Sequence, residues 1–239
     1  MERVGHLELF PLFLGEKAIR EPRLSAFALW HSCAAVEERL EAKLLPAERP
    51  VYRTLLARGS SPGTSSVGRL FDGLASLLGL CDRAGYEGEA AGRLETIARR
   101  HFRSAGGISG LRSQRPYPLP LSAEGIVSLE GLREGVGRDL TEGVPPEKIA
   151  FRFHLSLASL AGQVAERAGC RGIALAGGVF QNGLLVDLIE ALWAERFPVY
   201  IGRDLSPNDE SISFGQMVAS AWAGGELRGG TMSGREGRN

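Results

Sequence analysis

Apolar residues recur along much of the chain at the spacing of an amphipathic helix. The clearest case follows Pro145 and Pro146, where this spacing continues until Gly169. Proline suits the first turn of a helix and glycine the residue after its last turn, so we predict a helix that fills this interval. The same spacing predicts further helices over about 22–41, 50–58, 66–79, 88–101, 183–193 and 209–223.

Short apolar runs bounded by glycine and proline predict strands between these helices. One or two short strands are expected within the first 15 residues, and a pair over Tyr117–Leu121 and Ile126–Leu129, whereas the glycine- and serine-rich segment 104–115 is expected to be a mobile loop. Toward the C-terminus the order becomes strand (Gly172–Leu175), glycine turn, helix, strand (Val199–Gly202), loop and helix. That order predicts an α/β fold with a parallel or mixed sheet, in which the strand before the glycine turn is buried and central.

The glycine turn is a candidate ligand site. Gly177 and Gly178 lie in it, and Asn182 opens the following helix. Residues without a Cβ let a ligand approach the main chain closely, and the free amides at a helix N-terminus carry partial positive charge. The turn therefore predicts a site for a phosphate or a sugar hydroxyl. The alternative is that the glycines serve only the turn and that Asn182 is only a helix cap.

The composition is typical of a soluble globular protein. Hydrophobic residues make up 44% of the 239 residues, which suits one large or two small domains. Lys plus Arg and Asp plus Glu number 28 each, so bulk charge favours neither nucleic acid nor an anionic membrane. No apolar run reaches membrane-spanning length and no signal peptide is evident, so we expect a cytoplasmic location. The residues 224–239 are rich in glycine and arginine and are expected to form a disordered tail.

Histidine and cysteine form no metal or disulfide pattern in the sequence. The four histidines fall in four separate predicted elements, without the spacing of a metal site. One of them, His154, lies beside the apolar stripe of its helix and is interpreted as a satisfied core or interface histidine. The three cysteines are far apart and are interpreted as small buried apolar residues: Cys33, Cys81 and Cys170.

Three acidic residues are candidates for chemistry. Asp72 lies on the polar side of its predicted helix, Glu87 lies in a Tyr-Glu-Gly turn, and Asp209 opens a helix after a strand and a loop. The simpler interpretations are a surface charge, a turn residue and a helix cap favoured by the helix dipole. Asp209 occupies the same kind of position as Asn182, so the two loops are expected to be adjacent and to face one crevice at the strand ends.

Four motifs occur in a fixed order along the chain. They are Ser65–Leu80, Tyr86–Ala91, Gly177–Asn182, and Pro207–Asp209 followed by Phe214–Gln216. In this order they resemble the C-terminal part of the hydrogenase maturation carbamoyltransferases, the HypF family, from about Val4 to Trp222. The resemblance implies the C-terminal lobe of an actin-like ATPase fold over residues 1–223, with a helical insertion at about 22–104. That fold is similar to the fold of the tRNA threonylcarbamoyladenosine transferase.

The resemblance also implies a site and a reaction. Asp72 is expected to contact the ribose of a carbamoyl-adenylate, which is made from ATP. The full implied set is, for the nucleotide, Asp72, Glu87, Gly88, Gly177, Gly178 and Asn182, and, for a divalent metal, Asp209. No catalytic acid, base or nucleophile is implied. In the family the metal polarises the carbamoyl group, a thiolate at the C-terminus of a partner protein attacks it, and AMP leaves; the product becomes the cyanide ligand of the NiFe centre.

The sequence also departs from the family pattern. Two metal-binding histidines and the acylphosphatase, zinc-finger and carbamoyl-adenylate-forming domains belong to a segment that would precede Met1. We therefore expect the chain to be inactive unless it is joined to or complemented by that N-terminal half. Glu210 and Ser211 replace a usual pair of glycines, and Ala176 stands where a small hydroxyl residue is common.

Three functions stay open on the sequence. The first is part of a carbamoyltransferase. The second is a noncatalytic nucleotide-binding or partner-docking module derived from the same fold. The third is a transferase or sugar-kinase-like enzyme with a different acceptor. The fold alone does not separate them.

Overall fold

The computed structural model describes residues 2–12, 14–59, 61–202 and 204–223, and the predicted tail at 224–239 lies outside these ranges. The chain forms two compact units. The larger unit contains the residues up to Ala174 together with Asn182–Tyr200. The smaller unit contains Leu175–Gln181 and the described residues from Ile201 onward.

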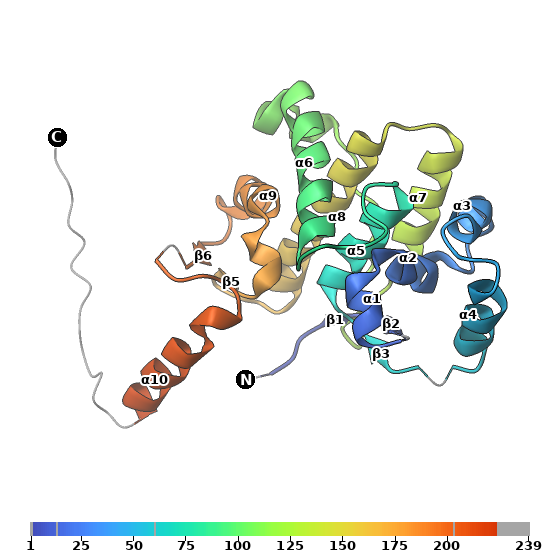
Figure 1. Ribbon diagram of the computed structural model, residues 1–239. Coiled ribbons are helices and arrows are strands. Elements are labelled where there is room, and N and C mark those ends of the chain that lie inside the picture. Colours follow the sequence, from blue (N-terminus) through green and yellow to red (C-terminus); the bar gives the residue numbers. More distant parts are fainter. Residues whose placement is uncertain (1, 13, 60, 203, 224–239) are drawn as a thin grey trace. The chain divides into compact units, whose positions relative to one another are not determined.

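Helices make up most of the larger unit (Figure 1). Helix α2 packs on α5, α6 packs on both α5 and α8, and α8 packs on α9. The helices of this unit are α1 (Glu16–Arg20), α2 (Pro22–Trp30), η1 (Ala34–Val36), α3 (Glu37–Glu41), α4 (Glu48–Ala57), α5 (Val67–Leu77), α6 (Glu89–Ser104), η2 (Gly107–Ser113), α7 (Glu130–Thr141), α8 (Pro146–Arg167) and α9 (Gly183–Trp193). The smaller unit has η3 (Gly178–Gln181), η4 (Asp209–Ser211) and α10 (Ile212–Ala223). No described helix is both long and apolar enough to cross a membrane.

The described strands are short and pair into three two-stranded sheets. Strand β1 (His6–Leu7) runs parallel to β4 (Ile126–Val127), and β2 (Phe10–Pro11) runs antiparallel to β3 (Gly63–Thr64). Strand β5 (Ile173–Leu175) pairs with β6 (Val199–Ile201). The predicted α/β class is confirmed. The predicted central burial of β5 is wrong, because β5 has one neighbouring strand and only its last residue is buried.

The core of the larger unit is built around α2 and α5. All nine residues of α2 are buried, and so is α5 from Leu70 onward. The α5 helix has the ends that its sequence predicts: the hydroxyl of Ser66 accepts a hydrogen bond from the backbone N–H of Arg69, and Gly79 after the helix has φ 79°. Glycine at position 73 lets the two helices meet, since a Cβ there would lie 2.7 Å from Cδ1 of Leu29.

Helices α8 and α9 also meet at a glycine. A Cβ on Gly162 would lie 1.9 Å from Cε2 of Trp193, whose indole N–H donates a hydrogen bond to the carbonyl of Ala158 (2.9 Å). We therefore expect Gly162→Ala to lower the free energy of unfolding by about 1–3 kcal/mol, because Trp193 must move. The matched control is Gly92→Ala in α6, where a Cβ meets open space. Gly92→Ala should raise the free energy of unfolding by about 0.5–1 kcal/mol. Urea denaturation curves that shift in the same direction for both variants would contradict the packing role of Gly162.

Two predicted elements are wrong in extent. The helix predicted over 22–41 is divided, because the chain leaves the core after Trp30; α2 ends there, and η1 and α3 follow. The strand predicted over Tyr117–Leu121 contributes only an isolated bridge between Leu121 and Val127. Prolines at 116, 118 and 120 lack the N–H groups that a strand would donate.

The segment 104–115, which was predicted as a mobile loop, contains η2, and helix α7 was not predicted at all. Three glycines at 131, 135 and 137 weaken the helical signal of α7. These glycines have a packing role. A Cβ on Gly135 would lie 2.5 Å from Cδ1 of Tyr117, and one on Gly137 would lie 2.9 Å from Sγ of Cys33.

The cysteine interpretation holds for one residue of three. Cys81 is buried, Cys33 is half-buried, and Cys170 is exposed. The prediction that all three are buried apolar residues is therefore wrong for Cys170, which follows the end of α8 where the chain turns at the surface.

Candidate nucleotide site

Asp72 is a buried carboxylate within α5. The residue is 6% exposed, and its Oδ2 lies 2.7 Å from Nη1 of Arg69, one turn earlier in the helix. Burial raises the pKa of Asp72 to about 6, although the charge of Arg69 opposes this rise. The alternative interpretation of Asp72 as a solvated surface charge is therefore wrong. A buried carboxylate with a raised pKa is common at functional sites.

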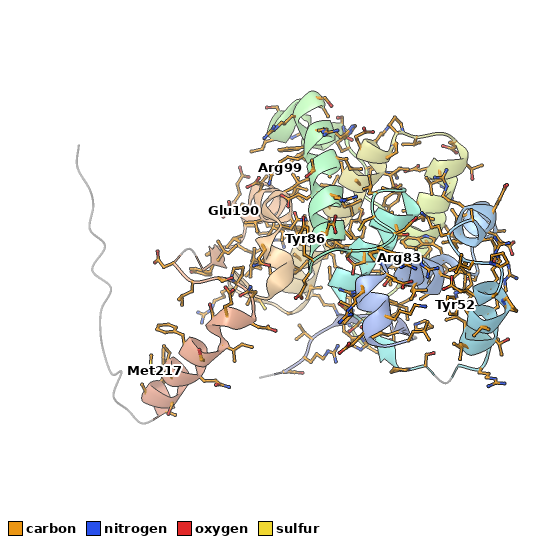
Figure 2. All side chains as sticks on the ribbon, viewed as in Figure 1. Tyr52, Arg83, Tyr86, Arg99, Glu190 and Met217 are labelled. Carbon is orange, nitrogen blue, oxygen red and sulfur yellow. The ribbon has the colours of Figure 1, made fainter. Side chains whose placement is uncertain are left out.

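The loop before α6 carries Glu87 and Gly88, and both residues are exposed. Gly88 has φ 83° and is the first residue before α6, and a Cβ there would meet no atom within 4 Å. The carboxylate of Glu89 holds the loop by accepting a hydrogen bond from the N–H of Gly85 (2.6 Å). Figure 2 shows Tyr86 at this loop, and it is 69% exposed. The backbone at Gly88 is thus both fixed and open to a ligand.

Asn182 caps α9 and is 8% exposed. Its Oδ1 accepts a hydrogen bond from the N–H of Leu185 (2.9 Å), so the capping interpretation is confirmed. Its Nδ2 lies 3.0 Å from Nε2 of His154, and Nδ1 of His154 lies 2.7 Å from the carbonyl of Ala150. A carbonyl only accepts, so we assign the proton of the imidazole to Nδ1 and the acceptor to Nε2.

His154 is therefore the satisfied core histidine that the sequence predicts. It is fully buried, and burial lowers its pKa to about 4, which keeps the ring neutral at pH 7. A neutral ring with its proton on Nδ1 is the form that can accept from Asn182. The nucleotide-binding role of Asn182 stays a prediction beside this structural role.

The amides at the N-terminus of α9 are less free than the sequence suggests. Oε1 of Glu95, on α6, accepts a hydrogen bond from the N–H of Leu184 (3.0 Å). The same carboxylate pairs with Arg99 (2.9 Å), which also pairs with Asp187 of α9 (2.9 Å). Figure 2 shows Arg99 in this region. A protein carboxylate thus already occupies part of the anion position that the helix dipole favours.

Asn182→Asp tests the link between Asn182 and His154. Aspartate keeps the acceptor for Leu185 but removes the donor to Nε2, so the pKa of His154 should rise from about 4 because the charged ring can donate to the new carboxylate. In the wild type, the neutral buried ring contributes stability above its unfolded pKa of about 6.5, and this contribution is lost as the pH falls toward 4. In the variant we expect the folded pKa of His154 to exceed 6.5. The charged ring then contributes stability at low pH, and the free energy of unfolding should fall as the pH rises.

Nitrogen-15 NMR of His154 and urea denaturation at pH 5 and pH 8 measure the two effects. Asn208→Asp is the matched control, because Asn208 caps η4 and its Oδ1 accepts from the N–H of Glu210 (3.0 Å). An unchanged titration of His154 in Asn182→Asp contradicts the assigned hydrogen bond.

In the smaller unit, the glycine turn and the loop that bears Asp209 lie side by side. Gly177 has φ 105°, and its N–H donates a hydrogen bond to the carbonyl of Pro207 (2.6 Å). A Cβ on Gly178 would lie 3.9 Å from Cβ of Asn208. The predicted adjacency of these two loops is confirmed for Gly177 and Gly178.

Asp209 is exposed at the first position of η4. The capping interpretation of Asp209 is wrong, because the cap is Asn208. Within the part of the chain that the structure describes, no three His, Cys, Asp or Glu side chains gather as a metal would require. One carboxylate does not hold a divalent cation tightly, so these residues alone do not fit the implied metal.

Sequence reasoning did not single out three charged residues near the predicted site, Arg69, Glu95 and Arg99. The spacing of Glu95 and Arg99 signals an ion pair along α6. Nothing local shows that Glu95 reaches the amide of Leu184, which lies 89 residues further along the chain.

Comparisons with known proteins assign the fold. Residues 1–216 match the family described as "Carbamoyltransferase, Kae1-like Domain, second subdomain". The chain is 32% identical over 245 residues to the carbamoyltransferase HypF of Synechocystis sp., covering 93% of this chain and 30% of that protein. It is 34% identical over 227 residues to the carbamoyltransferase HypF of Rhodobacter capsulatus, covering 92% of this chain and 28% of that protein.

A solved structure gives the same result. The crystal structure of full-length HypF in the phosphate- and nucleotide-bound form aligns with a TM-score of 0.77 and 26% identity, covering 97% of this chain and 30% of that chain. The fold is therefore that of a Kae1-like domain, and the predicted actin-like fold class is confirmed. The chain belongs to the carbamoyltransferase HypF family, within the second subdomain of its Kae1-like domain. It spans about 30% of the length of these relatives.

Proposed function

We propose that this chain is the C-terminal part of a carbamoyltransferase. The enzyme moves a carbamoyl group from carbamoyl-adenylate to the C-terminal cysteine of a partner protein in the maturation of NiFe hydrogenases, in the cytoplasm. The observation that carries the proposal is the match of residues 1–216 to the second Kae1-like subdomain of that family. Because the chain spans about 30% of its relatives, the activity is proposed for an assembly that includes the N-terminal half.

Asp72 is proposed to bind the ribose. With a pKa of about 6 the carboxylate is ionised at pH 7 to 8, and an ionised carboxylate can accept hydrogen bonds from two hydroxyls. The open backbone at Gly88, beside Glu87, leaves room for the nucleotide on the same unit. Gly177, Gly178 and Asn182 are proposed to bind the rest of the nucleotide.

The proposed reaction is acyl transfer to sulfur. The thiolate of the partner protein attacks the carbamoyl carbon, a C–S bond forms, and the bond from that carbon to the phosphate oxygen breaks. AMP leaves with the electron pair. No described residue is assigned as an acid or a base in this step. Asp209 is proposed as one ligand of a divalent metal, whose other ligands would come from outside this chain, and no step is assigned to that metal.

The test is transfer by the assembled enzyme. The chain is co-expressed with the part of the Synechocystis relative that it does not match, and the complex is supplied with carbamoyl-adenylate and a partner protein that ends in cysteine. Mass spectrometry should find one carbamoyl group on that cysteine. Asp209→Ala should reduce transfer, and Glu210→Ala, the exposed neighbour, should not. If the complex forms and binds nucleotide but transfers no carbamoyl group, the result supports the noncatalytic module instead.

A further inference from the structure

The carboxylate of Asp72 is held at one oxygen only. Its Oδ2 lies 2.7 Å from Nη1 of Arg69, whereas none of the described residues forms a hydrogen bond with Oδ1. The side chains of Arg69 and Asp72 are 17% and 9% exposed, so this ion pair is largely removed from water. Oδ1 is therefore the oxygen that remains for a hydroxyl of a ligand.

Arg69 is itself held in place from the side of α1. Its Nη1 also donates a hydrogen bond to the carbonyl of Ala18 (3.4 Å), a residue that is 2% exposed. Its backbone lies at the start of α5, where its N–H donates to the hydroxyl of Ser66 (3.4 Å). A guanidinium is planar and presents its donors in a fixed geometry. A guanidinium that is fixed at both ends therefore fixes the direction of the carboxylate that it pairs with.

Among the described residues, Arg69 is the charged group that lowers the pKa of Asp72. These two are the charged residues of α5, which packs on α2 and α6. The thiol of Cys81, after α5, stays protonated at pH 7, because burial raises its pKa above the usual value. Phe71 contacts His154 of α8, whose ring is neutral at pH 7. Other charged groups on the elements around α5 pair with one another: Arg23 with Glu21 and Glu48, Lys43 with Asp82, Arg93 with Glu89, Arg99 with Glu95, Lys17 with Glu48, and Arg20 with Glu16.

We infer that Arg69 is a positioning residue for nucleotide binding, which orients the carboxylate of Asp72 and keeps it charged so that Oδ1 accepts a ribose hydroxyl. The inference rests on the proposed function, in which Asp72 binds the ribose. Burial by itself favours the protonated acid, in which one oxygen carries a hydrogen and accepts less well. The positive charge of Arg69 opposes this protonation.

The test is the affinity for adenosine between pH 5 and pH 9, measured by calorimetric titration. The chain is co-expressed with the part of the Synechocystis relative that it does not match. Adenosine carries the ribose but no phosphate that would itself titrate. Because the pKa of Asp72 is about 6, only about a tenth of this carboxyl is ionised at pH 5, so the dissociation constant should be about tenfold higher there than at pH 7. Asp72→Asn should remove this pH dependence, which separates it from other titrating groups.

Arg69→Gln removes the charge and keeps a polar side chain. The bend in the plot of log Kd against pH should then move upward by about 1–3 pH units, so that the affinity lost at pH 7 returns toward pH 9. Arg69→Lys keeps the charge and should keep the bend near its wild-type pH. Arg20→Gln is the matched control, because Arg20 is an arginine of α1 whose side chain is 80% exposed. Its profile should equal that of the wild type.

Three results overturn the inference. The wild-type enzyme could bind adenosine equally well from pH 5 to pH 9, or not at all. Arg69→Gln could keep the wild-type profile. Arg69→Gln could also lose affinity equally at pH 7 and pH 9, which would show that Arg69 contacts the nucleotide itself or serves only the fold.

Two further measurements keep the outcome clear. Thermal unfolding of the free chain shows whether Arg69→Gln folds. If it does not, Arg69→Lys decides, since a lost or displaced bend in that variant contradicts the role given to the charge. A carbamoyl-transfer assay on the same enzyme separates the two proposals. The expected profiles without any transfer keep this inference and remove the proposed function, whereas transfer with a flat profile does the reverse.

Discussion

Replacing Arg23 by alanine is expected to lower the free energy of unfolding by about 3–5 kcal/mol. Arg23 is 4% exposed in the first turn of α2. Its guanidinium donates hydrogen bonds to Glu21 (2.9 Å), to both carboxylate oxygens of Glu48 (2.6 and 2.9 Å) and to the carbonyl of Lys43 (3.1 Å). Without it, two largely buried carboxylates lose the cation between them, although Glu48 keeps hydrogen bonds from the N–H of Leu45 (3.0 Å) and the hydroxyl of Tyr52 (2.9 Å). The cost arises from the repulsion between these two charges as well as from the lost bonds.

The pH dependence of the loss tests the cause. Hydrogen bonding to Arg23 holds the pKa of Glu48 well below its usual value of 4.5, and the same bond raises the pKa of Arg23. A carboxyl whose folded pKa is lowered contributes stability above its unfolded pKa, and this contribution is lost as the pH falls. Arg23→Ala should therefore be most harmful at neutral pH, and its deficit should shrink below about pH 4.5, where the carboxyls take up protons in the variant.

Arg53→Ala is the matched control. Arg53 also donates to two glutamates, Glu37 (2.7 Å) and Glu41 (2.8 Å), but its side chain is 55% exposed. Solvent screens such pairs, so this substitution should cost far less. Urea denaturation at pH 7 compares the two variants. Similar losses for Arg23→Ala and Arg53→Ala contradict the role given to burial.

The elements that were predicted correctly are those whose ends have local signals. The helix after Pro145 begins and ends where proline and glycine predict, and α5 has its serine cap and its glycine stop. The helix predicted over 22–41 fails because its end at Trp30 depends on where the core stops, which periodicity does not encode. Helix α7 was missed because its glycines allow close packing against Tyr117 and Cys33, which are distant in sequence.

In the candidate site, too, the residue types were predicted from the sequence, whereas their burial and their partners were not. The sequence identifies Asp72 as an acidic residue opposite the apolar stripe of α5, and this position predicts exposure. The structure buries that side as well: Ser76, on the same face, is fully buried, and Nη1 of Arg69 lies 3.4 Å from the carbonyl of Ala18. Likewise, the link from Asn182 to His154 joins residues 28 positions apart. Residue type is thus readable from local sequence, but burial and partners depend on tertiary packing.

Asp72→Asn is expected to stabilise the protein at pH 8 and to weaken nucleotide binding. The pKa of Asp72 is raised from 3.8 to about 6, so keeping this carboxylate ionised in the folded protein costs about 3 kcal/mol. A group with a raised folded pKa gives stability that is full below its unfolded pKa and is lost as the pH rises through the folded pKa. The advantage of asparagine should therefore be small at pH 4 and grow to about 3 kcal/mol by pH 8. The pKa of about 6 already includes the charge of Arg69, which lowers it. Losing the pairing with Arg69 therefore does not change the expected gain in stability.

Nucleotide affinity should change in the opposite direction. A hydrogen bond to a charged group contributes about 1.5–3 kcal/mol, so the dissociation constant for ATP should rise about 10- to 100-fold in the assembled enzyme. Calorimetric titration measures the affinity and urea denaturation the stability, with Glu87→Gln, an exposed carboxylate in the adjacent loop, as the control for stability. Loss of both stability and affinity means that the carboxylate serves the fold through Arg69. A gain in stability with unchanged affinity removes Asp72 from the nucleotide site, because the buried carboxylate would then contribute nothing to nucleotide binding.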